Sequence, residues 1–496
     1  MSIQQSKAHP FTKPNADVIF TSSDGVQFRA HKIILSEASS FFDGRSCIPV
    51  TETSTVLENL LRLCYPIDDP LLVDIESVRA TLEAAMKYDM QEAIKLTKTR
   101  LINFIHTAPL RVYAIACRLL LEDVALASAN EVVRKKVQAG FVPEMDEIPA
   151  GAYYRLLQHG KEKWSILFPR YKFCTAEPSS AKATASFQPT PSFVPKLDAS
   201  FFALSAADLI LRSSNLVDFR VHRAFLGVAS PALIAKIPPP GPLPFSLSST
   251  SKADIPVIVL EEDSQVVSTL LQIYYPNGRP DLGDLQGVCG ALVAAEKYAM
   301  EKAIQILRIA LESFNDVDPL RLYFAACRFG LKQLAIRAAK RSLGKPVDHA
   351  YYPELDSGGV SAGTYHRLMD YHRKCQSAAL ALTTTREWIL PDWLSLLDRR
   401  CSGHGEHACW FNPYMKKAKE ALVHPFGSSV NTNTLISSIV EKQFLLNRSR
   451  DCACTSSEGI ISLLKFSEHF AQEVDRVVGQ VKLEPPCASA PPNDLW

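Results

Sequence analysis

Alternating apolar residues near the N-terminus predict a β-hairpin that is followed by helices. From Val26 to Ala30 every second residue is apolar, and an Asp-Gly pair lies just before this segment. The sequence from DVIF to VQFRAH therefore predicts two strands around a tight turn. From Leu57 to Cys64 the apolar residues recur at i, i+3, i+4 and i+7, which predicts an amphipathic helix. This helix is expected to end at Tyr65, because the next residue is a proline.

The same order of patterns returns later in the chain. Seven residues of the first hairpin and helix recur 191 positions later: Asp17, Phe28, Arg29, His31, Leu35, Ala38 and Ser39. After a 19-residue insertion containing PPPGPLP the offset becomes 210. Seven of the eleven positions from Ala84 to Ile94 are identical to those from Ala294 to Ile304. A match this long and in register indicates an internal duplication, and the two copies are called the first and second repeats below.

The second repeat contains a hairpin pattern of its own, DLILRSSNLVDFRVH, in which Asn215 is expected to take the left-handed turn position. A third strand is predicted at IPVIVLEED, with a weaker counterpart at IPVTE in the first repeat. The segment between Phe42 and Pro49 is short, so the sheet of the first repeat is expected to be incomplete. In the C-terminal region, helices are predicted around 413–423, 434–446 and 458–479.

The predicted fold class is α+β, with two related domains, each followed by a helical extension, and a mostly helical C-terminal region. The linker and the tail are assigned from their Ser-, Ala- and Pro-rich composition. The predicted parts are an N-terminal tail (1–13), domain 1 (14–105), helical extension 1 (106–174), a linker (175–203), domain 2 (204–315) with a Pro-rich insertion (238–256), helical extension 2 (316–380), a C-terminal helical region (381–480) and a disordered tail (481–496).

Composition narrows the classes of function. Lys and Arg number 54 and Asp and Glu number 52, so the net charge of +2 favours neither direct nucleic-acid binding nor attachment to an anionic membrane. We find no apolar run long enough for a signal peptide or a membrane-spanning helix. Twelve cysteines, mostly isolated in apolar helical patterns, are typical of a reducing compartment. We therefore expect a cytoplasmic or nuclear protein.

The ordered set of these motifs resembles a BTB/POZ domain. In the first repeat the resemblance rests on DVIF, GVQFRAHKIILSEASSFF, LENLLRLCYP and LEAAMKYDMQEAI, and in the second on FRVHRAFLGVASP, PVIVLEE, LLQIYYP and LVAAEKYAMEKAI. The tandem arrangement is similar to divergent chains common in mushroom-forming fungi. The resemblance implies a non-enzymatic protein that binds protein partners.

Two acid–base pairs match the family positions that form a charged pocket at the top of the fold: Asp17 with Lys32, and Asp208 with Arg223. The resemblance suggests a partner-binding pocket there. A structural ion pair is the simpler interpretation, and proton transfer a third, although no catalytic nucleophile accompanies these residues. His31 and His222 end the second strand of each hairpin and are expected to be structural.

The densest group of soft metal ligands lies in the C-terminal region. Its cysteines are Cys401, Cys409, Cys452 and Cys454, and His404, His407, His424 and His469 are near in sequence. Four such side chains could hold a structural zinc, although Cys-x7-Cys and Cys-x-Cys are not usual finger spacings. Unligated thiols are the alternative interpretation. We predict no other cofactor, and we find no P-loop, dinucleotide or kinase motif.

The leading hypothesis is a scaffold whose two BTB-like domains bind proteins and pair with each other within the chain. An adaptor for a cullin-type ubiquitin ligase and a transcriptional scaffold are the two alternatives that the resemblance suggests. A zinc-dependent enzyme built on the C-terminal cysteines is the alternative from another class, and it requires bound metal.

Overall fold

The computed structural model describes residues 10–39, 47–161, 172–175, 196–197, 207–235, 255–275, 279–347, 351–357, 359–397, 410–446 and 457–484. The chain divides into two compact units. Unit 1 consists of Met1–Ser179 with Leu355–His366, and unit 2 consists of Ser180–Glu354 with Arg367–Trp496. Each unit is described on its own below.

Unit 1 begins with a three-stranded sheet in the order β2-β1-β3. Strands β1 (Val18–Thr21) and β2 (Gln27–Ala30) form the predicted antiparallel hairpin, in which Phe20 faces Phe28. Alternate side chains of both strands are buried, which is the pattern that the sequence predicted. Strand β3 (Cys47–Pro49) pairs in parallel with β1, so the third strand does form in the first repeat despite the short segment before it.

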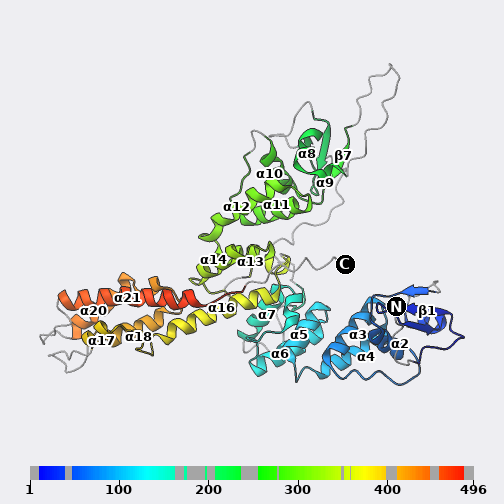
Figure 1. The fold of residues 1–496 in the computed structure, drawn as a ribbon, viewed down its shortest axis with the longest axis horizontal. Helices are drawn as coiled ribbons and strands as arrows, with labels where there is room; N and C mark the ends of the chain where they lie inside the picture. Colours follow the sequence, from blue (N-terminus) through cyan, green and yellow to red (C-terminus); the bar gives the residue numbers. More distant parts are fainter. Residues whose placement is uncertain are drawn as a thin grey trace, which may run out of the picture. The chain divides into compact units, whose positions relative to one another are not determined.

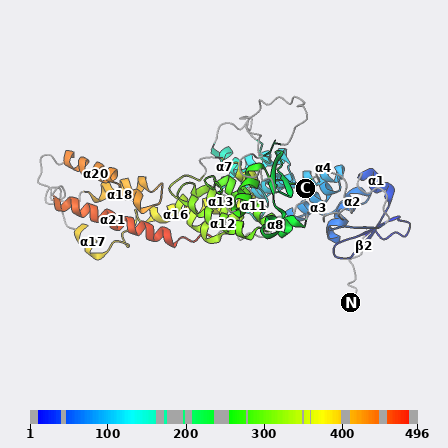
Figure 2. The ribbon, with the colours of Figure 1, turned by 90° about the horizontal axis from the view of Figure 1, so that it is seen from above.

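Helices follow the sheet in the described part of unit 1, and α2 to α7 are labelled in Figure 1. They are α1 (Lys32–Ala38), α2 (Ser54–Cys64), α3 (Ile75–Lys87), α4 (Gln91–Asn103), α5 (Pro109–Arg118), α6 (Glu122–Lys135), the 3-10 helix η2 (Pro143–Glu147) and α7 (Ala150–Lys161). Figure 2 shows α1 to α4 grouped near β2. Their inner faces share one hydrophobic core with the sheet, which includes Phe28, Leu60 and Tyr88. Helix α2 ends before Tyr65-Pro66, as expected from the proline.

Phe11 belongs to this core, although the sequence analysis placed it in the N-terminal tail of residues 1–13. Its side chain is 3% exposed and packs edge to face on Tyr65, with 5.2 Å between ring centroids. The backbone N–H of Arg29 in β2 donates a hydrogen bond to the carbonyl of Phe11 at 2.9 Å. The folded domain therefore starts before residue 14, because one aromatic residue in a polar segment is enough to anchor it.

Unit 2 repeats the order of strands and helices of unit 1. Its sheet has the order β4-β6-β5-β7, in which β5 pairs antiparallel with β6 and parallel with β7. The strands are β4 (Lys196–Leu197), β5 (Leu209–Arg212), β6 (Val217–Val221) and β7 (Val257–Val259). The helices that follow in the same order are α8 (Arg223–Ala229), α9 (Pro231–Ile234), α10 (Ser264–Tyr274), α11 (Leu285–Lys297), α12 (Glu301–Glu312), η4 (Ser313–Asn315), α13 (Pro319–Arg328) and α14 (Lys332–Ser342). The next two helices of the chain are α15 (Glu354–Ser357) and α16 (Ala362–Ala381), and their residues from Leu355 to His366 belong to unit 1.

The hairpin turn of the second repeat differs from its prediction. Asn215 was expected in the left-handed conformation, but Leu216 holds it, with φ of 61°. The equivalent residue of the first repeat is Gly25, with φ of 80°. The side chain of Asn215 is used instead to bind Ser264 at the start of α10, 49 residues later. Local turn preferences could not indicate this long-range contact.

The C-terminal region is helical, and the three helices predicted there are confirmed. They correspond to α18 (Phe411–Ala421), α20 (Asn433–Leu446) and α21 (Ser457–Gln480), and the region also contains α17 (Pro391–Leu397) and α19 (Gly427–Val430). Phe466 and Phe470 of α21 pack against Trp388 and Tyr414. Among the described residues, no helix is both long and apolar enough to cross a membrane.

Several predicted parts lie outside the described residues. These are most of the linker (175–203), most of the Pro-rich insertion (238–256) and residues 485–496 of the tail.

Candidate functional site

The aspartates of the predicted pocket hold the start of the first helix in each repeat. Oδ1 of Asp17 accepts a hydrogen bond from the backbone N–H of Lys32 at 2.7 Å, and Oδ1 of Asp208 accepts one from Arg223, also at 2.7 Å. The first N–H groups of a helix have no partner within the helix, so a carboxylate there stabilises it. Both aspartates therefore bind the backbone at the start of the helix, and among the described residues neither forms an ion pair with the basic side chain of its predicted partner. Binding of a partner by these four residues stays a prediction.

The two predicted structural histidines are half-buried at the end of the hairpin. The backbone N–H of His31 donates to Oη of Tyr65 at 2.6 Å, and that of His222 donates to Oη of Tyr275 at 3.0 Å. The ring Nδ1 atoms lie 3.3 and 3.4 Å from the same hydroxyls. Burial raises the pKa of both tyrosines, so the phenols stay protonated. The tyrosine of each Tyr-Pro pair thus joins α2 or α10 to the hairpin, a role that the sequence analysis missed.

A third pair of contacts repeats between the sheet and the next helices. Oη of Tyr88 donates to Oε2 of Glu52 at 2.5 Å, and Oη of Tyr298 donates to Glu262 at the same distance. Burial alone would raise the pKa of Glu52, but hydrogen bonds from Lys87 and Tyr88 outweigh it and lower that pKa. The Lys-Tyr pair within LEAAMKYDMQEAI and within LVAAEKYAMEKAI therefore binds the glutamate that follows the third strand in both repeats.

The two repeats differ in the apolar side chains that their first helices expose. On α1 only Ile33, 72% exposed, is a large apolar side chain on the surface, and Glu37 is exposed nearby. On α8 Phe225 is 40% exposed and Val228, at the position equivalent to Glu37, is 84% exposed. The first helix of the second repeat thus exposes an apolar side chain where the first repeat exposes a glutamate.

The edge strand of the second repeat has the same character. On β7, Val257 and Val259 are 44% and 70% exposed on either side of the buried Ile258. The residue equivalent to Val259 in β3 is Pro49, which has no N–H to offer a further strand. Strand β7 lies at the edge of its sheet and has no proline within its span, so it is suited to pairing with an added strand.

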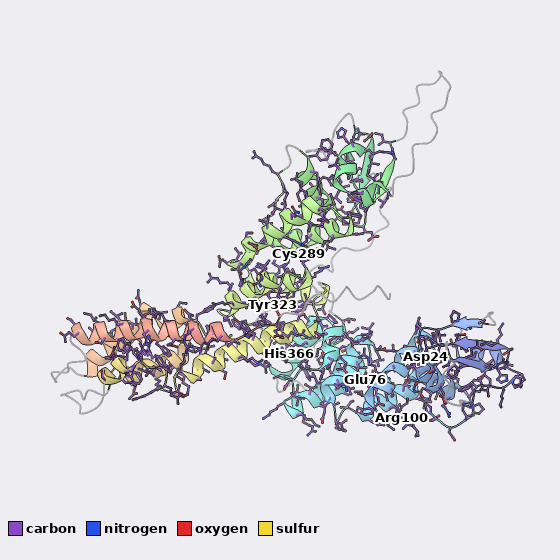
Figure 3. The ribbon with its side chains drawn as sticks, viewed as in Figure 1. Asp24, Glu76, Arg100, Cys289, Tyr323 and His366 are labelled. Carbon is purple, nitrogen blue, oxygen red and sulfur yellow. The ribbon has the colours of Figure 1, made fainter. Side chains whose placement is uncertain are left out.

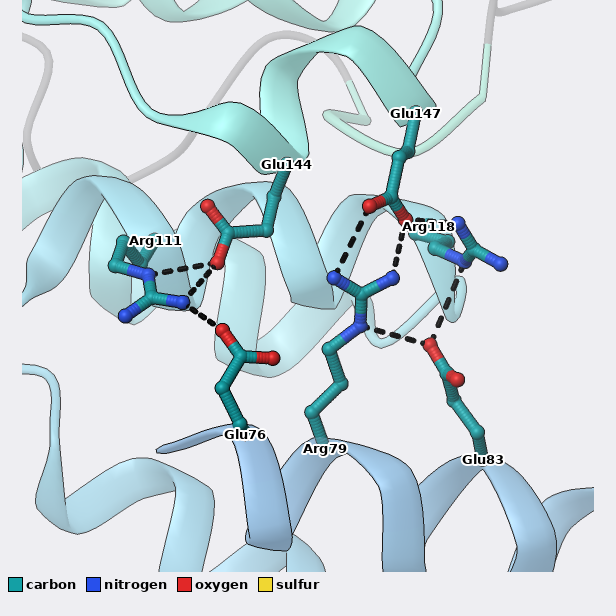
Figure 4. A network of polar contacts seen from close by, with 7 residues as sticks. All are labelled: Glu76, Arg79, Glu83, Arg111, Arg118, Glu144 and Glu147. Atoms are coloured by element: carbon teal, nitrogen blue, oxygen red, sulfur yellow. Dashed lines mark hydrogen bonds and ion pairs between the residues drawn. The ribbon is translucent and has the colours of Figure 1, made fainter. Parts of the chain in front are cut away.

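A network of ion pairs joins the domain of the first repeat to its helical extension (Figure 4). Glu147 of η2 binds Arg79 of α3 and Arg118 of α5, and both arginines also contact Glu83 of α3. Next to this group, Arg111 of α5 binds Glu76 and the buried Glu144. The side chain of Arg79 is only 14% exposed, so the network is shielded from water at its centre.

The second repeat keeps only part of this network. Arg321 binds Glu354, as Arg111 binds Glu144 in the first repeat. Cys289, labelled in Figure 3, stands where the first repeat has Arg79, and its burial raises the pKa of the thiol to about 11. The thiol is therefore protonated near neutral pH and cannot form the ion pairs that Arg79 forms in the first repeat.

Most of the side chains considered as zinc ligands lie outside the described residues. Cys401, Cys409, Cys452 and Cys454, with His404 and His407, lie outside them. His469 stacks on Trp393 at 6.4 Å between ring centroids, and His424 lies near His372. In the part of the chain that the structure describes, no three His, Cys, Asp or Glu side chains are placed to bind a metal. The structural zinc stays a prediction.

Comparison with known proteins places one part of the chain in a family. Residues 9–105 match the BTB/POZ domain, a non-enzymatic module of protein–protein interaction. The match begins close to Phe11 and ends after α4, so it covers the sheet and the helices packed on it in unit 1. No curated protein matches the chain.

Proposed function

We propose that the chain is a non-enzymatic scaffold with two BTB-like domains, in which the second repeat supplies the main protein-binding surface. The BTB/POZ match at residues 9–105 carries this proposal. The second repeat supports the two-domain form, because β5, β6 and β7 of unit 2 are paired as β1, β2 and β3 are in unit 1. All three pairs of long-range hydrogen bonds described above also recur at equivalent positions.

The apolar face of α8 and the edge of β7 are the surfaces that we assign to partners. Val228 is 84% exposed and Val259 is 70% exposed. Exposed apolar side chains of this size gain free energy when a partner covers them, at roughly 25 cal/mol per Å² of buried apolar area. In the first repeat these two positions hold Glu37 and Pro49. We therefore assign the first repeat mainly to support and the second to recognition.

Copurification from the native cells, followed by mass spectrometry, tests this proposal. The bait is the tagged full-length chain, compared with Val228→Glu on α8 and with the control Ile309→Glu on α12, where the side chain is also exposed (72%). We expect partners of the wild type to remain with the control and to decrease at least fivefold with Val228→Glu. Circular dichroism confirms that both variants are folded.

The identity of the partners decides between the two versions of the scaffold. A cullin scaffold lost with Val228→Glu favours the ubiquitin-ligase adaptor, and transcriptional regulators lost in the same way favour a nuclear scaffold. Recovery of no partner above an unrelated bait, or equal recovery by both variants, would contradict the proposal.

A further inference from the structure

The segment Leu355–His366, called the clasp below, packs within unit 1, although it follows the second repeat in sequence. It contacts the segment from Ala139 to Arg155 in helical extension 1. Ring Nε2 of His366 (labelled in Figure 3) lies 2.9 Å from the carbonyl of Ala139. A piece of the second repeat therefore completes the fold of the first.

The backbone contacts of the clasp are reciprocal. The N–H of Ala362 donates to the carbonyl of Ile148, and the N–H of Ala150 donates to the carbonyl of Val360, both at 2.8 Å. They flank an antiparallel bridge between Pro149 and Ser361.

The partners in this bridge are equivalent positions of the duplication. PEMD at 143 returns as PELD at 353, and GAYYRL at 151 returns as GTYHRL at 363. Ile148 thus corresponds to Val360, and Ala150 corresponds to Ala362. Tyr153 and Tyr365, which are also equivalent, meet edge to face at 5.9 Å between ring centroids. Equivalent residues that contact each other reciprocally define a local two-fold axis, as in a homodimer.

A buried ion pair strengthens the clasp. Nη1 and Nη2 of Arg155 donate to Oδ2 and Oδ1 of Asp356 at 2.8 and 3.0 Å, and the two side chains are only 7% and 15% exposed. The guanidinium also donates to the carbonyl of Phe173. Gly151 is needed beside this pair, because a Cβ there would overlap the carboxylate of Asp356. Removing one partner would leave a buried charge without its counter-ion, which is costly.

We propose that the clasp is a homotypic interface, which one chain uses within itself and which a second copy of the chain can occupy instead. The inference rests on the two-repeat organisation of the proposed function but on none of its partners. A self-complementary interface offers the same contacts within a chain and between chains, so concentration decides which forms. The two sides of the clasp are joined covalently within one chain, so the contact within a chain is favoured over the contact between chains in dilute solution.

Charge reversal at the buried pair tests the exchange in the full-length chain. Arg155→Asp and Asp356→Arg each place two like charges together, both within a chain and between identical chains. When the two variants are mixed, Arg155 of one chain can pair with Asp356 of the other. The two introduced side chains carry opposite charges, so they can pair as well. We expect each variant alone to be monomeric in multi-angle light scattering, and the mixture to form a complex of about twice 54.9 kDa.

The double variant Arg155→Asp with Asp356→Arg in one chain is the matched control, and we expect it to be monomeric again. A mixture that stays monomeric while circular dichroism shows both variants folded would overturn the proposal, as would dimers of one variant alone. If a single variant does not fold, isotope-labelled and unlabelled wild type are mixed and cross-linked. Mixed cross-links between residues 139–156 and 355–366 that increase with concentration would support exchange, and their absence would overturn it.

Discussion

Asp24 and Ser54 are 30 residues apart and are joined by two hydrogen bonds, in which the backbone N–H and the hydroxyl of Ser54 donate to the carboxylate at 2.9 and 2.6 Å. Asn215 binds the backbone N–H of Ser264 in the second repeat at 2.9 Å. Each hairpin turn thus caps the helix that follows the third strand. Because the turn has an acid in one repeat and an amide in the other, the two repeats should differ in their response to acid.

Replacing Asp24 by Ala should lower the free energy of unfolding by about 1 kcal/mol, which is typical for loss of a helix cap. Hydrogen bonds from Ser22 and Ser54 lower the pKa of Asp24 below its ordinary value of 3.8. Its stabilising effect is therefore present above that value and is lost as the pH falls through the lower pKa of the folded state. Thermal unfolding at pH 7 and at pH 3 measures both effects.

Asp24→Asn is the matched control, because it copies Asn215 in the second repeat. It should keep the cap at neutral pH and weaken the acid dependence. An alanine variant that unfolds at the wild-type temperature at pH 7 would show that this contact adds no stability.

The left-handed turn residue gives a second prediction. Gly25 and Leu216 both have positive φ, and no atom lies within 4 Å of a Cβ added at Gly25. Gly25→Leu should therefore cost only the backbone strain of that conformation, about 1–2 kcal/mol. Leu216→Asn should raise the stability of unit 2, since asparagine tolerates this conformation better. Hydrogen exchange of the two hairpins measures each change locally, and a Gly25→Leu variant with unchanged exchange would contradict the explanation.

These turns show which features the sequence could predict. Alternation from Val26 to Ala30 was sufficient for the hairpin, and helical spacing from Leu57 to Cys64 was sufficient for α2. Both depend on residues close in the chain. The contact of Asn215 with Ser264 spans 49 positions, and that of Arg155 with Asp356 spans 201 positions. No local pattern contains that information, although the duplication limits which segments can be equivalent.

The candidate surfaces were predicted only in kind. From the sequence, both domains were expected to bind proteins, but the pocket was assigned to Asp17 and Asp208, which bind backbone. The difference between the repeats at Val228 and Glu37 was visible in the aligned sequences. Its meaning depends on which side of α8 is buried, and a helix of seven residues has too few turns for periodicity to show this.

The ion-pair network of the first repeat gives a third prediction. Arg79→Cys copies Cys289 of the second repeat and leaves Glu147 and Glu83 with one arginine fewer between them. We expect a loss of about 1–2 kcal/mol, between the values for exposed and buried ion pairs. The loss should be smaller in 1 M salt, because salt screens the exposed parts of the network.

Arg62→Ala is the control for this network, since Arg62 pairs with Glu58 one turn away on α2 and lies outside the network, and loss of such an i,i+4 pair should cost about 0.5 kcal/mol or less. Thermal unfolding at low and high salt compares the two variants. Equal losses for both would mean that the network adds nothing beyond ordinary surface pairs.

A buried histidine predicts how unit 2 responds to acid. Nε2 of His372 lies 2.9 Å from Oγ of Ser342, and burial together with the nearby His424 lowers the pKa of His372 to about 4. The unfolded chain binds a proton below pH 6.5, whereas the folded chain does so only near pH 4. Stability should therefore fall as the pH decreases between these values, by about 2 kcal/mol at pH 5.

His372→Gln removes the titrating group, so the unfolding free energy of this variant should depend less on pH over this range. Denaturant unfolding at pH 7 and pH 5 measures the difference, with the exposed His106→Gln as control, and equal pH dependence in the wild type and His372→Gln would contradict this assignment.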